Sequence, residues 1–83
     1  MIVQHLKAPN DSNGNPRGLW AVYGSDSGNL VELIEEGYAG RPDVCDKRRN
    51  PDMVEIPEIN ITAGEYNAWK KYAKERHIYW PHW

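Results

Sequence analysis

Three segments in the first half of the chain carry the hydrophobic patterns of β-strands. Residues 2–7 alternate between a more apolar and a more polar face, which is typical of a half-buried strand. Residues 19–23 are apolar on both faces and rich in aromatic and β-branched side chains, so we expect them at the centre of a sheet. Residues 30–36 return as a third strand. The connections at 8–18 and 24–29 consist of turn-forming residues, which favours antiparallel pairing of consecutive strands.

The pattern changes in the second half of the chain. Residues 43–52 are polar, charged and bracketed by prolines, and we expect a loop there. Residues 53–61 alternate again, but Pro57 cannot donate to a sheet ladder, so this segment is predicted to be an edge strand or a broken one. Thr62 and Glu65 then have the spacing of a capping box, which predicts a helix starting at Thr62. Apolar positions recur along one face of this helix at Tyr66, Trp69, Ala73 and His77. Pro81 ends any helix.

These elements predict a single α+β domain over residues 1–83, because a chain of this length has no room for a second core. We expect a small antiparallel sheet of three to four strands with one C-terminal helix packed on one face. Along the chain we expect three strands, then, in a four-stranded sheet, the fourth strand, and then the helix. The inward face of the helix, with Tyr66, Trp69 and Ala73, is expected to meet Trp20 and Val22 of the central strand.

Composition and charge narrow the classes of function. The chain has four Trp, five Tyr and no Phe, and Trp and Tyr suit both core margins and interfaces. A formal net charge of −2 argues against a protein whose main role is to coat nucleic acid. Residues 1–45 carry three basic and six acidic side chains, whereas residues 46–83 carry seven and six. The hypothesis of a local basic patch in the second half of the chain therefore stays open.

The sequence also bears on where the protein is located. The N-terminus has neither a basic region nor a long apolar stretch, and one cysteine cannot form an internal disulfide, so we expect a cytoplasmic protein. No run approaches the roughly 18–20 apolar residues that cross a bilayer, so we expect no membrane contact.

Candidate catalytic and metal-binding groups are also few. His77 and His82 are five residues apart with Pro81 between them, which is a poor zinc-binding spacing, and His5 lies far away in the sequence. Cys45 has acidic neighbours, which disfavour a reactive thiolate. There is no glycine-rich phosphate-binding motif. We therefore expect no metal, no cofactor and no enzymatic activity.

Two groups of residues are the candidates for contact with a partner. The first group is basic and lies in the predicted loop and on the predicted helix: Arg48, Arg49, Lys70, Lys71 and Lys74. The second group is the aromatic end of the chain: Tyr79, Trp80 and Trp83. These aromatic side chains either fold back to complete a small core or form part of an interface, where Trp, Tyr and Arg contribute most of the binding energy.

The sequence therefore favours a small non-enzymatic module that binds another protein stoichiometrically. Its size and character also fit phage or mobile-element proteins that inhibit or regulate a host protein, such as anti-defence proteins. The alternative is a nucleic-acid-binding accessory protein that uses the basic helix face and the loop. A third hypothesis is a homo-oligomer formed through the aromatic C-terminus or through an open edge strand, either near Pro57 or at residues 2–7.

Overall fold

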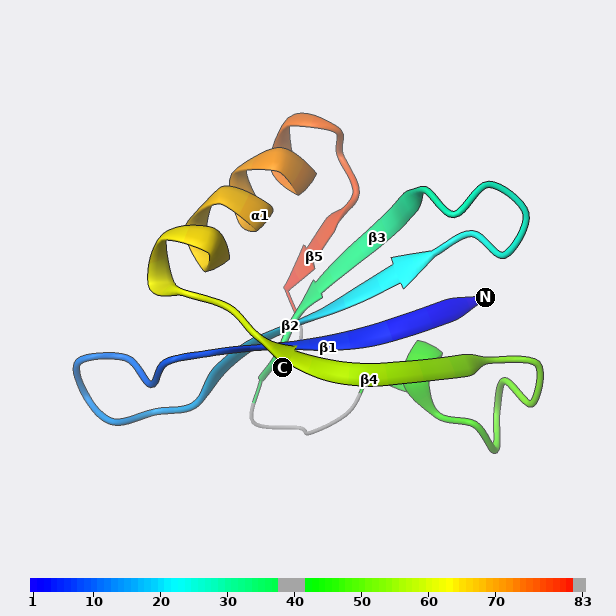
Figure 1. Ribbon diagram of the computed structural model, residues 1–83, viewed down its shortest axis with the longest axis horizontal. Coiled ribbons are helices and arrows are strands. Elements are labelled where there is room, and N and C mark those ends of the chain that lie inside the picture. Colours follow the sequence, from blue (N-terminus) through cyan, green and yellow to red (C-terminus); the bar gives the residue numbers. More distant parts are fainter. Residues whose placement is uncertain (38–41, 82–83) are drawn as a thin grey trace.

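The protein forms a five-stranded mixed sheet with one helix across one face (Figure 1). The structure is a computed structural model that describes residues 1–37 and 42–81. The strands are β1 (Ile2–Ala8), β2 (Arg17–Tyr23), β3 (Leu30–Glu35), β4 (Val54–Asn60) and β5 (Tyr79–Pro81). The helices are α1 (Ala63–Glu75) and a single 3₁₀ turn, η1 (Asp43–Cys45).

The strand order is β4-β1-β2-β3-β5, which corrects the predicted sheet. β1, β2 and β3 form the expected antiparallel meander, but β4 pairs with β1 and β5 pairs with β3 in parallel. The prediction of a purely antiparallel sheet of three to four strands is therefore wrong. The reason is that the connection from β3 to β4 and the connection from β4 to β5 each cross a face of the sheet before the next strand begins. Such crossover connections produce parallel pairs. β5 has only three residues, too few for a periodic pattern.

The two edges of the sheet are β4 and β5, so the expectation of an open edge at residues 2–7 is wrong. β4 is an edge strand, as Pro57 indicates. A bulge interrupts it, because Gln4 pairs with Ile56 whereas Leu6 pairs with Ile59. One extra residue of β4 is accommodated there, and the Gln4 side-chain amide donates a hydrogen bond of 3.0 Å to the Pro57 carbonyl.

Helix α1 begins as predicted. The Thr62 hydroxyl accepts a hydrogen bond of 3.0 Å from the Glu65 N–H, and the Glu65 carboxylate accepts one of 2.9 Å from the Thr62 N–H. The helix ends at Glu75, earlier than the periodicity predicted, because His77 takes a φ of 58° and the Ile78 N–H turns back to the Ala73 carbonyl. Across residues 1–37 and 42–81, no helix is long and apolar enough to cross a membrane.

The sheet buries apolar side chains on both faces, because β2 is apolar on both sides. The cluster on the helix side consists of Leu6, Ala8, Leu19, Ala21, Leu33, Ile61, Tyr66 and Ala73. The cluster on the opposite side, which we call the crossover side, consists of Val3, Trp20, Val22, Ile34, Cys45 and Met53. Cys45 of η1, within the predicted loop at 43–52, and Met53, which immediately precedes β4, cover the crossover side.

The predicted inward face of the helix is confirmed, but its predicted partners are wrong. Tyr66 and Ala73 are buried, and Trp69 packs half-buried against the same cluster. Trp20 and Val22 lie on the crossover side instead. Side chains of a strand alternate between faces, so the residues of β2 on the helix side are Leu19 and Ala21, the sequence neighbours of Trp20 and Val22.

Candidate functional site

The two flanks of α1 have different surroundings. The helix contacts β3 and β5, so it lies toward one side of the sheet. One flank carries Lys70 and Lys74, whose ammonium groups lie 5.8 and 5.0 Å from the centre of the Tyr79 ring in β5. The other flank faces the opposite way and forms a groove with the start of β3; the residues lining it are Leu30, Ala68, Trp69 and Tyr72.

Glu35 of β3 holds the lysine flank in place. One carboxylate oxygen accepts hydrogen bonds from the Tyr66 hydroxyl at 2.6 Å and from the Lys70 ammonium at 2.8 Å. The other oxygen accepts one from the Tyr79 hydroxyl. A single carboxylate thus joins β3, α1 and β5, beside the buried contacts that Tyr66 and Ala73 make with the sheet.

The protonation of this cluster suits a structural role. Burial alone would raise the pKa of Glu35, but the hydrogen bonds from Lys70, Tyr66 and Tyr79 outweigh it and hold that pKa below its ordinary value. Burial, reinforced by the hydrogen bond to Glu35 and its charge, raises the pKa of both tyrosine hydroxyls well above the usual range. At neutral pH the carboxylate is charged and both hydroxyls keep the protons that they donate.

A polar cleft of about 690 Å³ lies beside Glu35, between the β1–β2 loop and the first half of α1. Its charged groups contact one another or the backbone. The Arg17 Nε donates to the Pro9 carbonyl at 2.8 Å, and its guanidinium lies 5.3 Å from the centre of the Tyr66 ring. Asp11 accepts hydrogen bonds from the N–H groups of Asn13 and Asn15, both at 2.9 Å. These contacts make the cleft a part of the scaffold.

The groove flank borders an apolar surface that α1 leaves uncovered. Register places Val54, Ile56 and Ile59 of β4 on the same face as Leu6 of the helix-side cluster. We define the open helix-side surface as the apolar residues of this face that are exposed or half-buried: Ile2, Tyr23, Leu30, Val54, Ile56, Ile59, Ala68, Trp69 and Tyr72. Val54, Ile59 and Tyr72 are 55, 45 and 44% exposed.

This surface is uncharged where the sheet forms it. Within β1 and β4, both fully described, register places only one polar side chain among these residues, that of Gln4. Its amide is bound to the Pro57 carbonyl. The groove at the helix flank has a volume of about 320 Å³ and a mainly aromatic wall. At its rim the Arg76 guanidinium lies 3.7 Å from the centre of the Tyr72 ring.

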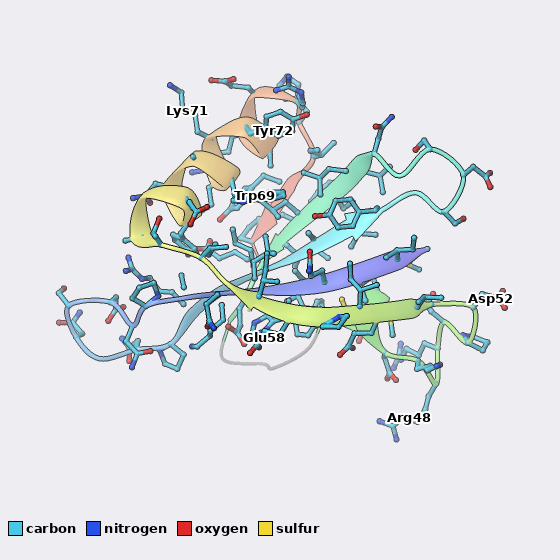
Figure 2. The ribbon with its side chains drawn as sticks, viewed as in Figure 1. Arg48, Asp52, Glu58, Trp69, Lys71 and Tyr72 are labelled. Atoms are coloured by element: carbon cyan, nitrogen blue, oxygen red, sulfur yellow. The ribbon has the colours of Figure 1, made fainter. Side chains whose placement is uncertain are left out.

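The structure separates the predicted basic residues into two groups. Figure 2 shows Lys71 on the outer face of α1, whereas Arg48 points into solvent on the crossover side of the sheet. Lys70 is turned toward Glu35, and Arg48 and Arg49 form ion pairs of 3.5 and 3.6 Å with Asp46 and Asp43. Lys74 lies over Tyr79. The loop and the helix therefore do not build one basic surface.

The two described aromatic residues at the end of the chain, Tyr79 and Trp80, differ in exposure. Tyr79 packs half-buried against the helix-side cluster, so it contributes to the core. Trp80 pairs with Ile34, faces the crossover side and is 54% exposed. Trp83 and His82 lie outside the described residues.

His5 occupies a structural position on the crossover side. Its ring stacks on Trp20 with 4.5 Å between ring centres. The Nδ1 atom lies 2.5 Å from Glu58, which the bulge of β4 directs toward it, and the Nε2 atom lies 3.3 Å from Glu36. A Cβ atom on Gly18 would lie 2.4 Å from the Glu36 carboxylate and 2.8 Å from the His5 Nε2, so a side chain there would displace this contact between His5 of β1 and Glu36, which follows β3.

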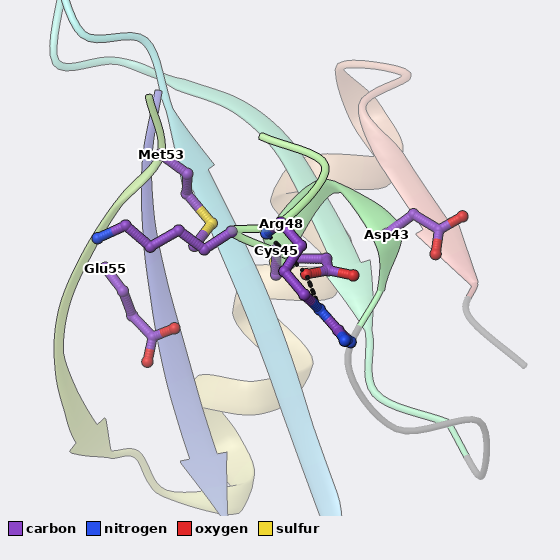
Figure 3. A pocket seen from close by; sticks show the side chains of 7 residues that line it. Asp43, Cys45, Arg48, Met53 and Glu55 are labelled. Atoms are coloured by element: carbon purple, nitrogen blue, oxygen red, sulfur yellow. Dashed lines mark hydrogen bonds and ion pairs between the residues drawn. The ribbon is translucent and has the colours of Figure 1, made fainter. Parts of the chain in front are cut away.

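Cys45 and the acidic residues around it form no recognisable centre. A hollow of about 500 Å³ is lined by side chains of mixed charge and by Met53. Figure 3 shows these side chains, with the Arg48 N–H and guanidinium both bound to the Asp46 carboxylate. Cys45 is fully buried in the crossover-side cluster, where it packs. In the described part of the chain, no three His, Cys, Asp or Glu side chains are grouped to hold a metal ion.

The open helix-side surface includes residues that sequence reasoning did not nominate. The signal was present in β4, because Ile56 and Ile59 belong to an alternating apolar pattern. The pattern predicts an edge strand there but does not indicate that α1 leaves its apolar side chains uncovered. No protein-family model, curated protein or solved structure significantly matches the chain.

Proposed function

We propose that the chain is a protein-binding module that contacts its partner stoichiometrically through the open helix-side surface. The observation that carries the proposal is the grouping of Val54, Ile59 and Tyr72, three strongly exposed large apolar side chains, on one face. Single exposed apolar residues are ordinary, but a grouped set of them is typical of interaction sites. Trp69 and Tyr72 add the residue types that dominate binding energy in protein interfaces.

The chemistry of the surface favours a protein over a nucleic acid. Nucleic-acid affinity depends on many cations that face one strand, and the candidate cations are divided between the two sides of the sheet. The apolar surface has little to offer a phosphate backbone. Occupying a partner's own binding surface would inhibit or regulate that partner, as phage and mobile-element proteins do to host proteins. We propose that this binding takes place in the cytoplasm.

The proposal predicts that a charge on the surface weakens binding. The partner is captured from a lysate of the source organism with the wild-type protein, identified and purified, and its Kd is measured by calorimetry. Ile59→Glu is expected to raise the Kd about tenfold or more, which corresponds to about 1.4 kcal/mol, because the new carboxylate loses its water in the interface. The matched control is Val31→Glu, because Val31 is also an aliphatic strand residue with 45% exposure. Val31 lines a different hollow, whose lining includes Val22 and Val44 of the crossover side as well as Tyr23.

Equal Kd values for the wild type and Ile59→Glu, or a loss confined to Val31→Glu, would show that the surface is not the binding site. Capture of nucleic acid, with an affinity that falls steeply with salt and is lost in Lys70→Glu, Lys71→Glu and Lys74→Glu, would establish the nucleic-acid alternative instead.

A further inference from the structure

The sheet is wide enough to carry two helices on one face, and the described chain supplies one. Five strands about 4.8 Å apart span about 19 Å between the outer strands. A helix with its side chains is about 10 Å across. Because α1 packs against β3 and β5, it leaves much of the helix-side face of β1 and β4 without a covering element.

The uncovered strip has the chemistry of a buried sheet face. Ile2, Val54, Ile56 and Ile59 present aliphatic side chains, and the Gln4 amide already has its partner within the protein. Such a strip matches the apolar face of an amphipathic helix, as in other complexes where a helix lies in a groove. The groove between Trp69 and Tyr72, at the start of β3 and across β2 from the strip, has room for one large apolar side chain.

The edge of β4 is poorly suited to the other common mode, the addition of a partner strand. Pro57 has no N–H to donate, and the bulge beside it breaks the regular spacing of main-chain groups. The Glu58 side chain is directed to His5 on the crossover side. These devices are typical of edge strands that are protected from pairing.

Among the residues that the structure describes, a second copy of this chain has no helix with its core-facing apolar side free. The apolar face of α1, with Tyr66 and Ala73, is buried against its own sheet. Its outer face carries polar and charged side chains, Asn67, Lys71, Lys74 and Glu75, all of them exposed. The helix that would cover the strip is therefore not α1 of a second copy.

We propose that a partner protein packs an amphipathic helix on the β1–β4 strip, alongside α1, with one large apolar side chain in the groove of Leu30, Trp69 and Tyr72. The inference rests on the proposed function and names the element that binds. The uncovered positions of β4 run from Val54 to Ile59, six residues with a length of about 20 Å. A helix of about 13 residues covers that length at 1.5 Å per residue, so a peptide of about 15 residues spans it.

Synthetic peptides test the inference without knowledge of the partner. Two fluorescein-labelled peptides of about 15 residues share one composition of Leu, Ala, Glu and Lys. One places Leu at helical spacing and the other places it at alternate positions. We expect the helix-patterned peptide to bind at least about tenfold more tightly by fluorescence anisotropy. We also expect Ile59→Glu to weaken this binding about tenfold and Val31→Glu to leave it unchanged. Tyr72→Ala on α1 provides a second variant if Ile59→Glu does not fold by circular dichroism.

Three outcomes would overturn the inference. They are tighter binding of the strand-patterned peptide, binding of neither peptide, and a dimer in sedimentation that Ile59→Glu dissociates. The first two would leave the proposed function standing if the natural partner still loses affinity for Ile59→Glu. If that loss is also missing, the proposed function fails as well.

Discussion

Replacing Glu35 with alanine is expected to lower the free energy of unfolding by about 2–4 kcal/mol. The carboxylate accepts from Tyr66, Lys70 and Tyr79 at once, and its side chain is only 27% exposed. Its removal leaves two hydroxyls and an ammonium group without their acceptor where α1 meets β3 and β5. Urea unfolding followed by circular dichroism measures the loss. Glu32→Ala in the same strand is the control, because register places Glu32 beside Val22 on the crossover side.

The same substitution predicts a change in pH dependence. The pKa of Glu35 in the folded protein lies below its ordinary value of 4.5, so the unfolded chain takes up the proton more readily. The contribution of Glu35 to stability is therefore complete above about pH 4.5 and is lost as the pH falls through the folded pKa. The difference between the wild type and Glu35→Ala should shrink on acidification. A difference that stays constant down to pH 2, or one that Glu32→Ala reproduces, would contradict this role.

Replacing Trp20 with alanine is expected to cost about 3–5 kcal/mol of unfolding free energy. Trp20 is buried in the crossover-side cluster, and the His5 ring stacks on it. Removal of the indole would leave a cavity, and the other side chains of this cluster, among them Cys45 and Met53, would lose their contacts with it. Trp20→Phe should cost less, since it keeps an aromatic ring. Tyr72→Ala, at an exposed position, should stay within about 0.5 kcal/mol of the wild type. Equal losses for Trp20→Ala and Tyr72→Ala would show that the crossover side is not a second core.

The elements governed by short-range chemistry could be predicted from the sequence. The capping box joins Thr62 to Glu65 three residues away, so its geometry follows directly from the spacing. The pairing of β1, β2 and β3 followed for the same reason, because short turns leave few alternatives. The indication of an edge strand at Pro57 needed only the missing N–H.

The arrangement of the remaining strands depends on contacts between distant parts of the chain. Nothing within the three residues of β5 distinguishes a strand from an extended tail. Its place beside β3 comes from main-chain pairing with β3 and from the hydrogen bond of Tyr79 to Glu35. The position of α1 likewise comes from the burial of Tyr66 and Ala73 against the sheet and from the contacts of Glu35. Whether Ile59 is buried or exposed follows from that position, so its own pattern could not reveal the open surface. Lys71 and Arg48 lie on opposite sides of the sheet because α1 and the connection between β3 and β4 cross opposite faces. The pattern of charges along the sequence does not indicate which face each connection crosses.

The binding site can be tested most directly by methyl NMR of the protein labelled at the Ile δ1 groups, during titration with the identified partner. Ile2, Ile56 and Ile59 report on the open helix-side surface, and Ile34 reports on the buried crossover side. We predict that the partner shifts the signals of the first three and leaves Ile34 unchanged. A partner that shifts Ile34 and leaves the other three unchanged would contradict the account.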